Sequence, residues 1–96
     1  MSIINLATIK SDLRVAHSSD DSILQVYLNA AEDEALRFLN SESLPLDTND
    51  ELAPSIYGAV FLLVRSKYDA ENGDEIAKLR RCAETMLMPY RIELGV

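Results

Sequence analysis

The sequence contains few of the residues that catalytic and metal-binding proteins rely on. It has one cysteine, one histidine and three glycines that are not clustered. A single cysteine permits neither an internal disulfide nor a cysteine-rich zinc site, and scattered glycines form no phosphate-binding loop. The histidine, His17, has only Asp20 and Asp21 nearby in sequence, which is typical of a solvated, helix-capping turn. We therefore predict no enzymatic activity, no cofactor and no bound metal.

Basic residues and long apolar runs are also scarce. Nine lysines and arginines stand against 16 acidic residues, which gives a net charge of −7. A protein that binds DNA regardless of sequence needs the opposite balance, so tight DNA binding is not expected. The longest apolar run, Ala59 to Val64, is too short to cross a bilayer. Residues 1–10 lack the pattern of a secretory signal, so we expect a protein of the reducing cytoplasm with no membrane partner.

The spacing of apolar residues predicts an all-α fold. We expect a single domain over residues 1–96, a compact bundle of four helices at about 7–16, 21–39, 52–68 and 74–88. A long polar loop separates the second helix from the third, and an alternating, extended tail follows Pro89. Asp50 is a plausible cap for the third helix, and Leu44 and Leu46 could anchor the long loop or form a short edge strand.

Two helices have a clear inward face. The second has its apolar face at Leu24, Leu28, Ala31, Ala35 and Phe38, and its predicted wet face carries the acidic run 32–34 with Gln25 and Asn29. In the fourth helix the residues predicted to point inward are Ile76, Leu79, Ala83, Met86 and Leu87. Cys82 falls in the same apolar stripe and is predicted to be buried.

The third helix is apolar on nearly every side between Ile56 and Val64. Three other helices are too few to cover such a surface, so part of it is expected to contact another subunit. Gly58 and Ala59 would let a neighbouring helix approach closely. The candidate contacts with another subunit or a partner are Tyr57, Phe61, Arg65, Tyr68, Tyr90, Arg91, Ile92 and Leu94.

Read in order, these segments resemble the small head–tail connector proteins of tailed bacteriophages, also described as neck, head-completion or DNA-packaging proteins. The first helix ends in Leu13-Arg14-Val15, and an acidic turn at Asp20-Asp21 opens the second helix, which carries the pair Ala30-Ala31. A polar loop, a Pro-initiated apolar helix from Pro54 to Val64 and then Tyr68 follow. The chain closes with the signature Leu87-Met88-Pro89-Tyr90-Arg91. The arginine often found shortly after the tyrosine is missing from the stretch 69–72, and Arg65 or Lys67 could replace it.

The resemblance implies a structural subunit of a phage or prophage neck. Such a subunit would form a homo-oligomeric ring, matching a dodecameric portal, between the portal protein and downstream neck or tail proteins. It would complete the head after packaging, assemble in the host cytoplasm and let DNA pass without tight binding, which the acidic balance suits. From the residues alone, a small acidic helical interaction module, such as a regulator or DNA mimic, remains the alternative.

Overall fold

The computed structural model describes residues 4–46, 49 and 51–91. Four α-helices occur there: α1 (Leu6–Leu13), α2 (Asp21–Leu39), α3 (Pro54–Tyr68) and α4 (Gly73–Leu87), followed by a short 3-10 helix, η1 (Met88–Tyr90). Within these described residues there is no β-strand, only an isolated antiparallel bridge between Leu46 and Leu52. The predicted all-α bundle of four helices is confirmed.

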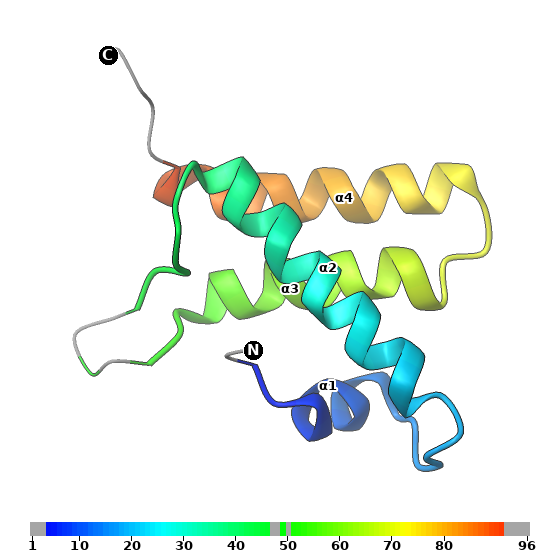
Figure 1. The fold of residues 1–96 in the computed structure, drawn as a ribbon. Coiled ribbons are helices and arrows are strands. Elements are labelled where there is room, and N and C mark those ends of the chain that lie inside the picture. The colour runs from blue at the N-terminus through cyan, green and yellow to red at the C-terminus, as the bar shows by residue number, and fades with distance from the viewer. Residues whose placement is uncertain (1–3, 47–48, 50, 92–96) are drawn as a thin grey trace.

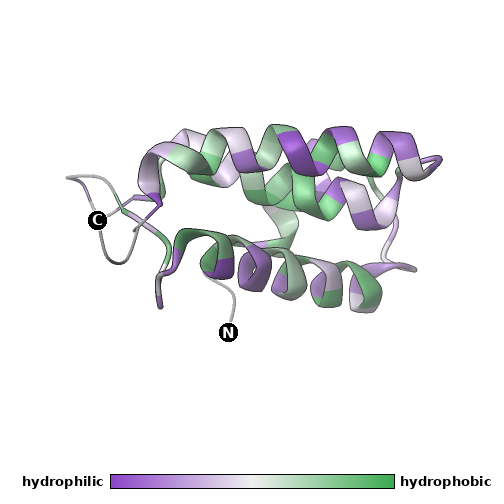
Figure 2. Ribbon diagram, turned by 90° about the horizontal axis from the view of Figure 1, so that it is seen from above, coloured by the Kyte–Doolittle hydropathy of each residue, from purple (hydrophilic) through white to green (hydrophobic). Residues whose placement is uncertain are grey.

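The helices form two layers. α3 and α4 pack side by side as an antiparallel hairpin, and α2 crosses this hairpin diagonally, mainly over α3 (Figure 1). Seen from above, α2 lies on one side and the α3–α4 hairpin on the other (Figure 2). The smallest extent of the molecule is 18 Å, about the depth of two helix layers packed 8–10 Å apart. The hairpin therefore has an inner side, facing α2, and an outer side.

Local chemistry determines where each helix begins and ends. The side chain of Asn5 accepts a hydrogen bond from the Ala7 amide (2.8 Å) and so caps α1. Arg14 takes a left-handed conformation (φ 62°), so α1 ends at Leu13 and not near residue 16. α3 begins at Pro54, because proline disfavours a helical conformation in the residue before it. Asp50, the predicted cap, lies outside the described residues.

The remaining ends follow similar rules. Asn40 closes α2 in a left-handed conformation (φ 56°). Asn72 caps α4 through a hydrogen bond from the Glu75 amide to its side chain (2.9 Å). Pro89, which cannot continue a regular helix, lies in η1, and α4 ends at Leu87.

The core lies between the two layers. Its fully buried members come from every helix and include Ile9, Leu24, Leu28, Ile56, Val60, Val64 and Leu87. Of the two leucines considered as anchors of the long loop, Leu44 is buried against this core, whereas Leu46 is exposed and makes the isolated bridge with Leu52. Burial of such core side chains is worth roughly 1.5–3 kcal/mol each, which makes this layer contact the main source of stability.

Candidate assembly surfaces

The aromatic candidates on α3 are partly engaged within the chain. Tyr57 and Phe61 stack with ring centroids 6.2 Å apart and an interplanar angle of 15°. The Tyr57 hydroxyl donates a hydrogen bond to the carboxylate of Asp12, which ties α1 to α3. Burial, together with the Asp12 hydrogen bond and charge, raises the pKa of the Tyr57 phenol above its ordinary value of 10.0. Both rings are half-buried, so an edge of this pair still reaches the surface.

The two candidates at the other end of α3 also have partners. The Tyr68 hydroxyl donates to Asp20 (2.8 Å) at the start of α2, and this hydrogen bond raises the pKa of Tyr68. Arg65 lies 3.5 Å from Asp69, just after α3, and 4.0 Å from Glu75 in the first turn of α4. Sequence reasoning placed both residues at an interface. The geometry shows that they fasten neighbouring segments of one copy, and their interface role stays a prediction.

The closing signature divides into residues that anchor the chain end and residues that it exposes. Leu87 is fully buried. The Arg91 Nε donates to the Phe38 carbonyl (3.0 Å), and its guanidinium lies 5.2 Å from the centroid of the Phe38 ring. Between these two anchors, Met88 is 51% exposed and Tyr90 37% exposed. The signature thus presents two apolar side chains on a fixed turn beside the end of α2.

The candidate residues do not form one patch. Tyr57, Tyr90 and Arg91 lie toward the end of the hairpin that holds the α2–α3 loop, whereas Arg65 and Tyr68 lie toward the α3–α4 turn (Figure 1). The last two candidates, Ile92 and Leu94, lie outside the described residues.

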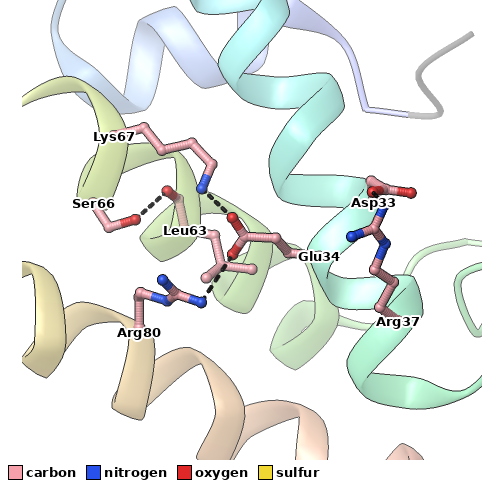
Figure 3. Close-up of polar contacts among 7 residues, drawn as sticks. All are labelled: Asp33, Glu34, Arg37, Leu63, Ser66, Lys67 and Arg80. Carbon is pink, nitrogen blue, oxygen red and sulfur yellow. Dashed lines mark hydrogen bonds and ion pairs between the residues drawn. The ribbon is translucent and has the colours of Figure 1, made fainter.

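The acidic residues 32–34 of α2 were predicted to share one solvent-exposed face, and this prediction is wrong. Successive helical residues point about 100° apart, and the three side chains have three different surroundings. Glu32 is buried (8% exposed) and lines a cleft of about 500 Å³ beneath the long loop. Glu34 turns inward to Lys67 of α3 and Arg80 of α4 (3.8 Å), whereas Asp33 pairs with Arg37 on another side of α2 (Figure 3).

Sequence reasoning missed a groove on the outer side of the hairpin. Its apolar lining is Leu62 of α3 with Cys82 and Met86 of α4, and its polar lining is Lys78, Arg81 and Thr85. Cys82 is exposed there, so the prediction that it is buried is wrong. The apolar stripe of α4 is wider than the surface that α3 can cover, and Cys82 lies at its uncovered edge.

α4 and α2 each expose further apolar side chains. Ile76, predicted to face inward, is 37% exposed because it lies in the first turn of α4, beyond the reach of α2. On α2, Ile23 is 42% and Val26 57% exposed. Neither was assigned to a surface from the sequence, because the spacing 24, 28, 31, 35 assigns the core and the opposite side was predicted to be polar and solvent-exposed.

The described part of the chain offers no sign of a catalytic or metal centre. His17 is exposed in the turn before α2. No group of three or more metal-binding side chains is found among the described residues. In the same residues, none of the helices has the length and apolar character needed to traverse a bilayer.

Two thin helix layers with exposed apolar side chains on both sides are typical of a building block of an assembly. A family model, that of phage gp6-like head–tail connector proteins, matches residues 3–87. The chain therefore belongs to this family, and the resemblance found in the sequence is confirmed. No curated protein and no solved structure gives a significant match. Members of the family are structural proteins of the virion, not enzymes, so this chain is a neck protein of a tailed phage that interacts with portal and tail proteins.

Proposed function

We propose that copies of this chain form a ring between the portal and the tail, complete the head after DNA packaging and surround the channel through which DNA leaves. The family match over residues 3–87 carries this proposal. It favours the neck ring over the acidic interaction module, because the match extends through all four helices. Assembly takes place in the host cytoplasm, and the subunit number follows that of a dodecameric portal.

The uncovered apolar surface supports oligomerisation. α3 buries Ile56, Val60 and Val64 within one copy, but Phe61 and Leu62 remain half-buried. Apolar side chains are also exposed at both ends of α4, where Ile76 and Tyr90 lie. A subunit that meets neighbours above, below and beside it in a ring would cover these separate patches.

The charge distribution supports passage of DNA without tight binding. The turn between α3 and α4 carries Asp69 and Glu71, and the first turn of α4 carries Asp74 and Glu75. Asp69 and Glu75 lie near Arg65, while Glu71 and Asp74 are exposed. Acidic walls around a channel repel phosphates and keep DNA from adhering. The turn between α3 and α4, together with the first turn of α4, is therefore the proposed lining of the channel.

The ring is tested by mixing the purified protein with portal rings, followed by mass measurement and negative-stain imaging. We expect subunits to bind the portal in an annular layer. A protein that stays monomeric and does not bind portal rings at high concentration contradicts the proposal. Tyr90→Ala should weaken portal binding more than Ile76→Ala, because Tyr90 belongs to the anchored closing turn and Ile76 to the opposite end of α4.

The channel lining is tested by Glu71→Lys combined with Asp74→Lys in assembled phage. We expect slower DNA ejection, or DNA retained in the neck, because lysines would bind passing phosphates. The matched control is Glu42→Lys combined with Glu84→Lys, an equal charge change at exposed acids away from the turn. Equal rates of DNA ejection for the two double variants would contradict the proposed lining.

A further inference from the structure

We infer that the outer groove of the α3–α4 hairpin receives the exposed face of α2 from the next copy, so that neighbouring subunits join head to tail. The inference rests on the proposed ring and names the surfaces that would build it. The outer groove is defined by Leu62, Lys78, Arg81, Cys82, Thr85 and Met86. The α2 face is defined by Ile23, Val26 and Asp33.

The two surfaces lie on opposite sides of the molecule. The inner side of the hairpin is marked by Leu63, Arg80 and Leu87, which line a space shared with Glu34 and Phe38 of α2. The residues of the outer groove lie on the other side of the same two helices. Val26 and Asp33 lie opposite the buried stripe of α2, because successive helical residues point about 100° apart. Since α2 and the hairpin form separate layers (Figure 2), that side of α2 faces away from the hairpin. Two different, oppositely directed surfaces make a heterologous contact, which is the kind that a rotation closes into a ring.

The charges are complementary. Five of the nine lysines and arginines form ion pairs within the described residues, namely Lys10, Arg37, Arg65, Lys67 and Arg80. A sixth, Arg91, is engaged with Phe38. Of the remaining three, Lys78 and Arg81 both line the outer groove and make no ion pair among the described residues. A groove with an apolar floor and two available cations fits an apolar helix face that carries an acid.

The face of α2 has this composition. Ile23 and Val26 supply exposed apolar side chains, and the Asp33 carboxylate, 56% exposed, lies on the same side two turns further along. Asp33 is paired with Arg37 within the chain (3.0 Å), but an exposed pair of this kind contributes little, so the carboxylate can exchange Arg37 for a cation of the outer groove. At 1.5 Å per residue, Val26 and Asp33 are about 10 Å apart along α2, and Met86 and Lys78 are about 12 Å apart along α4. Val26 can therefore rest on Leu62 and Met86 while Asp33 reaches the cations.

Cys82 makes the contact testable by disulfide trapping, because it is the chain's single cysteine and lies in the groove. In Val26→Cys rings assembled on the portal, mild oxidation should give a reducible ladder of linked subunits on a denaturing gel. Adding Cys82→Ser should abolish the ladder. Thr8→Cys, exposed on α1, is the matched control and should give no ladder. Equal cross-linking by Val26→Cys and Thr8→Cys overturns the inference.

Charge reversal supplies an independent readout. Arg81→Glu alone and Asp33→Lys alone should each weaken ring assembly by about tenfold or more, because like charges would then meet in the contact. The double variant should recover assembly. Arg14→Glu is the matched control, because Arg14 is an exposed cation away from the groove that makes no ion pair among the described residues, and it should leave assembly unchanged.

The outcomes separate this inference from the proposed ring. If rings form on the portal but neither the disulfide ladder nor the charge rescue appears, the subunit contact is wrong and the ring stands. If Arg81→Glu abolishes portal binding while Val26→Cys gives no ladder, the groove receives the portal and not a second copy. If the unmodified protein never associates with itself or the portal, both proposals fail.

Discussion

The inner and outer sides of the α3–α4 hairpin belong to the same two helices but differ in how completely one copy covers them. On α3, Leu63 faces α2 and is 4% exposed, whereas its neighbour Leu62 lies half-buried in the outer groove. On α4, Ala83 is fully buried and Cys82 is exposed. Adjacent residues of similar chemistry thus have opposite surroundings. The inner side of the hairpin therefore stabilises the single subunit, whereas the outer side is available for contact with a neighbouring subunit.

The charges repeat this contrast. On the inner side Glu34 lies between Lys67 and Arg80, and joins α2 to both helices of the hairpin (Figure 3). On the outer side Lys78 and Arg81 have no acidic partner within the described residues. A fold that satisfies its cations on one side and not on the other leaves the second side suited to an acidic partner.

The largest effect is expected from breaking the inner side. Leu63→Ala should lower the free energy of unfolding by roughly 2–5 kcal/mol, because it leaves a cavity between the layers. Leu62→Ala should cost about 1 kcal/mol or less, because its side chain already borders solvent, yet it should impair assembly. Urea unfolding of both variants measures the difference. Equal destabilisation would mean that the two sides are equally important to the single subunit.

A smaller effect is expected from the charges on α2. Glu34→Ala should destabilise the fold by about 1 kcal/mol, because its carboxylate serves both Lys67 and Arg80 in a partly covered site. Asp33→Ala should change stability by less than about 0.5 kcal/mol, because the exposed pair with Arg37 is well solvated. Thermal unfolding at low and high salt compares the two variants. A larger loss of stability for Asp33→Ala than for Glu34→Ala would contradict the conclusion that Glu34, and not Asp33, joins the two layers.

The smallest effect is expected at alkaline pH, from the two tyrosines that fasten α3 to its neighbours. Folding raises the pKa of Tyr57 and Tyr68 above 10.0, so the unfolded chain loses these protons first. Their contribution to stability is therefore complete below about pH 10 and declines as the pH rises above that value. The Tyr57→Phe, Tyr68→Phe double variant should lose stability less steeply between pH 9 and 11. Urea unfolding at several pH values measures this loss. If the free energy of unfolding falls with pH equally in both proteins, the effect is excluded.

Much of the fold was predictable from local patterns. The bounds of α2 agree with the prediction, because the spacing of Leu24, Leu28, Ala31 and Ala35 specifies one buried stripe. α1 was predicted too long because nothing in the sequence marks Arg14 as a left-handed residue. Of the candidate site, the closing signature was recognised, but the way Arg91 anchors it to Phe38 was not.

The surroundings of single side chains were harder to predict. Glu32, Asp33 and Glu34 read as one solvated run, but the packing of the loop and the hairpin gives each a different environment. Cys82 and Ile76 have the spacing of core residues and are exposed. A periodic pattern states which residues share a helix face, and it does not state how far the neighbouring helix extends over that face.

The sequence by itself determined the all-α class, the positions of the helices and the family, because these depend on short-range spacing, helix caps and motifs along the chain. The tertiary structure alone decided which side of the α3–α4 hairpin is closed by α2 and which remains a groove. The physical reason is that one crossing helix can cover only one side of a hairpin. Whether a side chain is core or surface is therefore settled by contacts between residues far apart in the chain.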